Sequence, residues 1–226
     1  MLLSKWPIVP GRVTESLWLA AMTGIVHCGS GNIGSVATAV EYLGGESTII
    51  ESPDDLDSCE RIIFPGVGSF YDVMIRLRQR GFDAALNRNV LERRKPTLGI
   101  CLGMQLMATE GTEGGGSAGL GWFEGTVEKI TAQKPDERVP HMGWNQIEIH
   151  QPHLLLNGIP PSSDFYFVHS FAMRTDKAAD VVATCDYGGG FVAIVARDNI
   201  FAAQFHPEKS QDHGLKIIEN FLDWNP

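Results

Sequence analysis

The sequence predicts an α/β fold: an open, mostly parallel, twisted sheet with helices on both faces, to which the second half adds short antiparallel strands. Two observations predict this fold. Over roughly the first 110 residues, four apolar, β-favouring segments alternate with helix-favouring ones, and such alternation builds parallel sheets through right-handed crossovers. After that, short strand-like segments follow one another with turns between them, and this spacing favours hairpins.

The first half contains the alternating elements. A strand at 24–28 precedes a helix over 33–43, whose apolar side chains recur at helical spacing on one face before Gly44 and Gly45 end it. The other elements predicted in this half are strands at 47–50, 61–64 and 97–100, a short helix beginning at 53–56, a helix after the capping residue Ser69, and a helix over 83–94.

The second half begins with a glycine-rich loop at 111–121. Short strands are predicted at 126–130, 145–149, 165–168, 181–184 and 191–195, followed by an apolar strand at 200–205 and an amphipathic helix over 212–222. Since the first half alone would leave the sheet unfinished, we expect one domain over 22–226, with 1–21 as an N-terminal extension outside the fold.

Composition excludes several classes of protein. The chain has 27 acidic and 18 basic residues, and no Lys/Arg-rich run that could follow a phosphate backbone, so no nucleic-acid partner is expected. Its four cysteines are scattered, which fits neither a disulfide framework nor a structural zinc site and favours a cytoplasmic protein without a metal. No apolar run approaches the roughly 18 residues that a membrane span needs.

The stretch Gly99-x-Cys101-x-Gly103 is typical of a nucleophile elbow, a tight turn from strand to helix that displays a reactive side chain. Small neighbours fit such a strained turn, and the first turn of a helix favours a thiolate. The alternative is a buried cysteine that only fills space.

His206-Pro207-Glu208 follows another apolar strand and supplies the groups that a cysteine nucleophile needs. Proline forces the preceding residue into an extended conformation, so the imidazole and the carboxylate can lie on one side. Because sites in open α/β sheets form at the carboxyl ends of the strands, Cys101, His206 and Glu208 are predicted to form a catalytic triad.

A third feature, the Pro65-Gly66-Val67-Gly68 turn, ends the strand that precedes the elbow strand along the chain. Its backbone N–H groups at Val67 and Gly68, together with that of Leu102, could form an oxyanion hole. The alternative is a simple turn between a strand and a helix.

One motif competes with this interpretation. Residues 29–34 match G-x-G-x-x-G between a strand and a helix, with Glu51 about twenty residues further on, as in dinucleotide-binding oxidoreductases. Such short glycine motifs also occur by chance, and the elbow and the His-Pro-Glu segment argue against this function.

Together these residues resemble a known family. GICLGMQ at 99–105 and HPEKS at 206–210 resemble the triad, or class I, glutamine amidotransferases, which have a flavodoxin-like fold. VPHMGWN at 139–145, FYFVHS at 165–170 and ARDNI at 196–200 resemble, within that family, the glutaminase subunit of imidazole glycerol phosphate synthase.

The resemblance implies that the chain hydrolyses L-glutamine to glutamate and ammonia without a cofactor. The ammonia would pass, within a heterodimer, to a (β/α)₈-barrel synthase subunit that forms imidazole glycerol phosphate and aminoimidazole carboxamide ribotide in histidine biosynthesis. By match to the family, Gln105 and Glu113 would bind the glutamine substrate, and Asn32, Tyr166 and Lys209 would face the synthase.

The chain departs from the family pattern at His27-Cys28, where an Asp-Tyr pair usually stands before the glycine turn. That turn is expected to face the synthase. A related glutaminase that feeds ammonia to a different enzyme, for example one that aminates a sugar, is therefore a second hypothesis.

Overall fold

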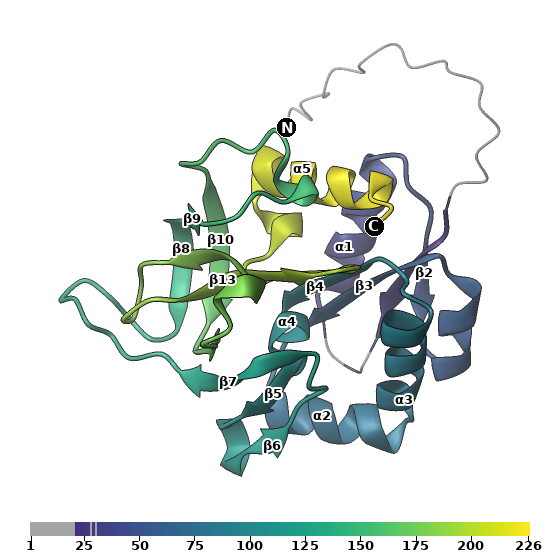
Figure 1. Cartoon of the computed structure of the whole chain (residues 1–226), viewed down its shortest axis with the longest axis horizontal. Helices are drawn as coiled ribbons and strands as arrows, with labels where there is room; N and C mark the ends of the chain where they lie inside the picture. The colour runs from purple at the N-terminus through teal and green to yellow at the C-terminus, as the bar shows by residue number, and fades with distance from the viewer. Residues whose placement is uncertain (1–20, 28, 30) are drawn as a thin grey trace, which may run out of the picture.

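The computed structural model describes residues 21–27, 29 and 31–226. The predicted extension at 1–21 lies, except for its last residue, outside the described residues, and so does Cys28. The single domain over 22–226 therefore stays a prediction, although the described chain folds around a continuous central sheet (Figure 1).

The central sheet has eight strands, of which five are parallel. In sheet order they are β2 (Ser47–Ile50), β1 (Thr23–Val26), β3 (Arg61–Gly66), β4 (Thr97–Cys101), β14 (Ile200–Ala203), β13 (Phe191–Arg197), β12 (Val181–Cys185) and β9 (Glu148–Ile149). The last three strands pair antiparallel. The predicted sheet, parallel first and antiparallel later, is confirmed.

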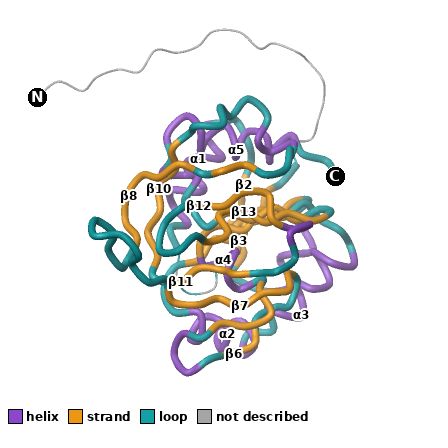
Figure 2. The backbone as a smooth tube through the Cα atoms, turned by 60° about the vertical axis from the view of Figure 1, so that its left-hand side comes forward, coloured by secondary structure: helices purple, strands orange, loops and turns teal. Residues whose placement is uncertain are grey.

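Two smaller sheets complete the second half. One pairs β8 (His141–Gln146) with β10 (Asp164–His169), and the other has the order β11 (Phe171–Arg174), β7 (Phe123–Lys129), β5 (Ala108–Gly111) and β6 (Ser117–Ala118). The four-stranded sheet lies beside α2 (Figure 2). Most neighbours in these sheets are antiparallel, but β5 and β7 run parallel.

The helices cover both faces of the central sheet. They are α1 (Ile33–Tyr42), α2 (Phe70–Gln79), α3 (Phe82–Leu86), α4 (Leu102–Leu106) and α5 (Gln211–Asp223), with shorter helical turns η1 (Pro53–Ser58), η2 (Asn87–Glu92), η3 (Glu113–Gly115), η4 (Leu154–Leu156), η5 (Ala178–Asp180) and η6 (Pro207–Lys209). In Figure 1, α1 and α5 lie above the sheet and α2 and α3 below it. None of the helices in the described part of the chain is long and apolar enough to cross a membrane.

Alternating side chains of the parallel strands fill two cores. Ile63 of β3 packs in the core under α1 and α5, whereas its neighbours Ile62 and Phe64 pack in the core under α2 and α3. Successive strand residues point to opposite faces, so a strand buried on both faces must be apolar throughout. This explains why the strand segments of the first half are nearly continuous apolar runs.

Three predicted segments differ from the structure. The helix predicted over 83–94 is split into α3 and the wider turn η2, where the buried Asn89 side chain donates to the Ala85 carbonyl. The predicted loop at 111–121 contains η3 and β6, because β6 pairs with the end of β5. The strand predicted at 145–149 is divided between β8 and β9, which belong to different sheets.

The buried Asn199, at the tight turn between β13 and β14, ties the central strands together. Its side chain donates to the carbonyls of Val90 and Lys95, at 2.9 and 2.8 Å, and its own carbonyl accepts from Thr97 N at the start of β4. These bonds fix where the strand that carries Cys101 begins.

Replacing Asn199 with Ala removes the donor to the buried Val90 carbonyl, whereas the Lys95 carbonyl keeps the Thr97 hydroxyl as a donor. We therefore expect the free energy of unfolding to fall by about 1–3 kcal/mol. Urea unfolding followed by circular dichroism measures this change. The matched control is Asn157→Ala at an exposed position, which should change stability by less than about 0.5 kcal/mol. Equal effects at both positions would contradict the role given to Asn199.

Candidate active site

The elbow at Cys101 is built by the close approach of two elements. Cys101 ends β4 and precedes α4 with φ 54° and ψ −111°, a conformation that non-glycine residues rarely adopt. A Cβ atom at Gly103 would lie 1.7 Å from the Phe64 carbonyl oxygen, and one at Gly99 would lie 2.8 Å from the Cβ atom of Ala202. Both glycines are therefore required by space, and the turn projects Cys101 at the carboxyl end of the sheet.

His206 and Glu208 follow β14, the strand that pairs with β4. The Nδ1 atom of His206 lies 2.8 Å from Oε1 of Glu208, and their side chains are 2% and 1% exposed. Asn32 donates to the same carboxylate oxygen at 3.2 Å. The carboxylate therefore holds the ring so that its other nitrogen, Nε2, is left for the chemistry.

The charges around His206 favour its protonated form. Burial alone would lower its pKa, but the negative charges of the Cys101 thiolate and the Glu208 carboxylate raise the pKa of His206 to about 10. Nε2 is buried without a hydrogen-bond partner among the described residues. A ring with so high a pKa is protonated at neutral pH and can donate a proton.

A cavity of about 320 Å³ joins the predicted residues. Its lining includes the three oxyanion candidates, two of the three predicted triad residues, both substrate candidates and Lys209. These are Val67, Gly68, Leu102, Cys101, His206, Gln105, Glu113 and Lys209. Of the other predicted residues, Glu208 lies directly behind His206 and Asn32 binds that carboxylate. Tyr166 is outside this lining and lies near Lys209, whose Nζ is 6.0 Å from its ring centre.

The two substrate candidates are already held by protein contacts. The Nε2 group of Gln105 donates to the Phe171 carbonyl at 2.7 Å and to Oε1 of Gln204 at 3.0 Å. An oxygen of Glu113 accepts from Phe70 N at 2.7 Å, the first N–H of α2. These bonds fix both side chains in place at the wall of the cavity.

Sequence reasoning missed the corner between β10 and β11, which forms another wall of the cavity through Val168, His169, Ser170 and Phe171. His169 is anchored there by two bonds, from Nε2 to His141 Nδ1 at 3.0 Å and from Nδ1 to the Phe171 carbonyl at 2.9 Å. The segments at 139–145 and 165–170 were noted because they resemble the family. The sequence itself does not indicate that the two segments pair as neighbouring strands.

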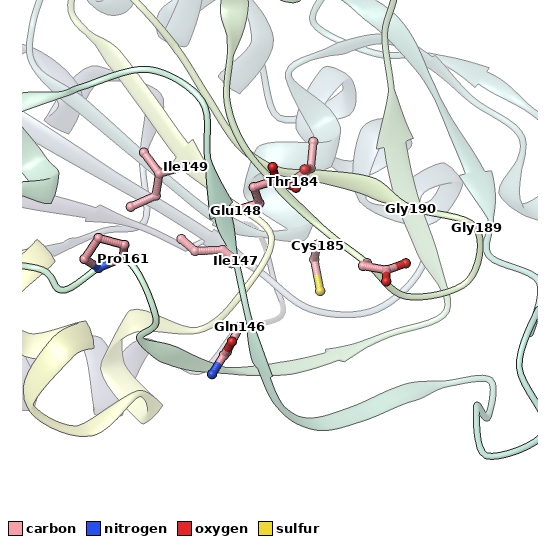
Figure 3. A pocket seen from close by; sticks show the side chains of 10 residues that line it. Gln146, Ile147, Glu148, Ile149, Pro161, Thr184, Cys185, Gly189 and Gly190 are labelled. Carbon is pink, nitrogen blue, oxygen red and sulfur yellow. The ribbon is translucent and has the colours of Figure 1, made fainter.

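A wider cavity of about 810 Å³ lies at the other end of the sheet, between β9 and the turn after β12 (Figure 3). Its thiol, Cys185, is 1% exposed, and burial raises the pKa of this group to about 12. A thiol with so high a pKa is a poor nucleophile at neutral pH. The smaller cavity is therefore the candidate active site.

Among the described residues, no group of three or more His, Cys, Asp or Glu side chains could hold a metal ion.

The sequence matches the family "Glutamine amidotransferase class-I" over residues 25–224. The chain belongs to this family. It is 46% identical over 211 residues to the imidazole glycerol phosphate synthase subunit HisH 2 of Nitrobacter winogradskyi, covering 91% of this chain and all of that protein. It is 47% identical over 201 residues to subunit HisH 1 of Campylobacter jejuni, covering 89% and 99%.

A solved structure, PurLQS from Thermotoga maritima, shares the fold with a TM-score of 0.72 at 19% identity, covering 91% of this chain and 99% of that one. The predicted membership of the class I glutamine amidotransferases, with a resemblance to the imidazole glycerol phosphate synthase subunit, is confirmed by these relatives.

The buried His141–His169 pair makes folding sensitive to acid. Burial lowers the pKa of His141 to about 4 and that of His169 to about 3. Below a pH of about 6.5 the unfolded chain therefore binds more protons than the folded one, so stability falls as the pH drops towards 4.

Replacing His141 with Phe should keep the stacking on Tyr187, whose ring centre is 3.8 Å away, but remove one buried titrating group. We expect the variant to lose about 1–2 kcal/mol less stability than the unsubstituted protein between pH 7 and pH 5. Urea unfolding at both pH values measures this difference. His150→Phe at an exposed position is the control, and a variant that loses as much stability as the unsubstituted protein would refute the assignment.

Proposed function

We propose that this chain is the glutaminase subunit of imidazole glycerol phosphate synthase. It hydrolyses L-glutamine to glutamate and ammonia, and the ammonia serves a synthase subunit in histidine biosynthesis. The observation that carries the proposal is a thiol on a strained elbow beside a buried imidazole and carboxylate, in a chain nearly half identical to HisH subunits.

In the proposed mechanism, the Cys101 thiolate attacks the side-chain amide carbon of glutamine. The backbone N–H groups of Val67 or Gly68 and of Leu102 bind the oxygen that becomes negatively charged. The His206 imidazolium, oriented by Glu208, gives its proton to the leaving ammonia. Water, deprotonated by His206, then displaces the sulfur from the thioester and releases glutamate.

Substrate selection is assigned to two side chains of the cavity wall. Gln105 and Glu113 bind the α-amino and α-carboxylate end of glutamine, and their fixed positions favour one orientation of the bound molecule. Because Glu113 is a carboxylate, it is suited to the α-ammonium group. The hydrogen bond from Phe70 N keeps the carboxylate at the cavity.

The partner is proposed to be a (β/α)₈-barrel synthase subunit, bound as a heterodimer next to Asn32, Tyr166 and Lys209. Trp144 of β8 lies beside Tyr166, with 5.9 Å between the centres of the two rings, which meet edge to face. The Trp144 side chain is 45% exposed. Exposed aromatic groups of this kind are enriched at protein interfaces. We place the complex in the cytoplasm, in keeping with the scattered cysteines.

The glycines before α1 match a dinucleotide-binding motif, but in this proposal the segment faces the partner. Asn32 ends the turn and donates to Glu208, so the turn connects the proposed partner surface with the triad. His27, where the family pattern differs, lies 3.5 Å from Glu51. Because the chain departs from the family pattern here, the alternative is a glutaminase that supplies ammonia to a different enzyme. The experiment below distinguishes the two.

Replacing Cys101 with Ala should lower glutamine-dependent activity by more than about 10³-fold, because the nucleophile is lost. Synthesis from added ammonium salt should continue. The measurement is product formation from each nitrogen source with the barrel-type synthase subunit of the same cell and its substrate.

Cys185→Ala is the matched control and should keep both activities within about twofold, since this thiol lies outside the triad cavity. Loss of both activities in Cys101→Ala would contradict the division of labour. Failure of the unsubstituted chain to bind or supply the barrel subunit, while it still hydrolyses glutamine, would point to another ammonia recipient.

A further inference from the structure

A buried glutamine that the triad does not use lies against the nucleophile. Gln204 is 0% exposed and directly follows β14, whose neighbour is β4. Ala203 pairs with Ile100 in the parallel register, so the next position places Gln204 level with Cys101. Its Nε2 atom lies 3.7 Å from the Cys101 sulfur. A fully buried polar side chain at this position needs a reason.

The surrounding bonds fix which end of the Gln204 amide faces the sulfur. Gln105 donates from Nε2 both to the Phe171 carbonyl and to the Gln204 amide oxygen. If Gln204 were turned over, two amide NH₂ groups would face each other, and if both residues were turned over, the Gln105 oxygen would face a carbonyl oxygen. One orientation satisfies every group, and it directs an N–H of Gln204 at Cys101.

The sulfur also has a neighbour that disfavours negative charge. The Val168 carbonyl oxygen lies 4.0 Å from it and can accept a bond from a thiol but not from a thiolate. The side-chain N–H of Gln204 has the opposite effect, because it can donate to a thiolate and so stabilises the negative charge. Hydrogen bonds to charged groups are about twice as strong as those between neutral ones.

We propose that Gln204 is a further catalytic residue, whose side-chain N–H donates to the Cys101 thiolate, and that Gln105 positions its amide. This role rests on the proposed function, in which Cys101 is the nucleophile. The same bond acts twice, because the thiolate is the attacking group in the first step and the leaving group when water cleaves the thioester. Gln105 would thus serve both the substrate and the nucleophile.

The test measures the reactivity of the Cys101 thiol directly. Gln204→Met keeps the length of the side chain but has no N–H, so alkylation of Cys101 by iodoacetamide at pH 7 should slow about tenfold. The pH at which the alkylation rate is half-maximal should rise by about one unit. Peptide mass spectrometry separates Cys101 from the other three cysteines.

Two further variants sharpen the result. Gln204→Glu keeps an oxygen for Gln105 but turns an oxygen towards the sulfur, so alkylation should slow at least as much as in Gln204→Met. Gln79→Met, at the exposed end of α2, is the control and should alkylate at the unsubstituted rate. Alkylation of Gln204→Met at the unsubstituted rate and pH midpoint, even if glutamine turnover falls, would show a packing role and overturn the proposal.

A measurement on the unsubstituted protein covers the case in which the variants do not fold. When Cys101 is alkylated, the NMR resonances of the Gln204 side-chain amide should shift, and unchanged resonances would overturn the proposal. Neither measurement needs glutamine or a partner. If Cys101 responds as expected but no glutamine is hydrolysed with the synthase present, the proposed function fails while the Gln204 contact stands.

Discussion

The site depends on the contact between the start of α4 and the end of β3, where Gly103 leaves no room for a Cβ atom beside the Phe64 carbonyl. This close approach forces the chain to turn at once after β4 and holds Cys101 in its strained conformation. It also brings Leu102 to the wall of the cavity. A side chain at Gly103 would move α4 away from the sheet and separate the sulfur from the groups that serve it.

The order of the sheet then gathers the remaining groups. Because β3, β4 and β14 are parallel neighbours, the Gly66–Gly68 turn, Cys101 and His206 reach the same edge although they are far apart in the sequence. The corner between β10 and β11 closes the cavity from the antiparallel half. The buried Glu208 pairs with the imidazolium, so the charge of the ring is not left uncompensated away from water.

The parallel half, and the placing of Cys101, His206 and Glu208 at one edge of the sheet, could be predicted because the signals are local: apolar runs, glycines around one cysteine, and a proline between His206 and Glu208. Contacts that arise from pairing between distant strands could not. In the sequence, Gln204 belongs to an apolar segment that predicts a strand. Only the pairing of β14 with β4 shows that it lies beside Cys101. Likewise, His169 lines the cavity at the corner after β10, where it is held by His141 of the paired strand β8. The residues expected to face a partner were assigned only by resemblance to the family.

The central claim is that His206, held by Glu208 in the cavity that Cys101 also lines, carries the proton that it donates. The most direct measurement is an NMR titration of the His206 ring in protein labelled with ¹⁵N histidine. The account predicts a doubly protonated ring at pH 8, with deprotonation near pH 10, because the thiolate and the carboxylate favour the charged ring. A ring that is neutral at pH 8 and titrates near pH 6.5 would contradict it.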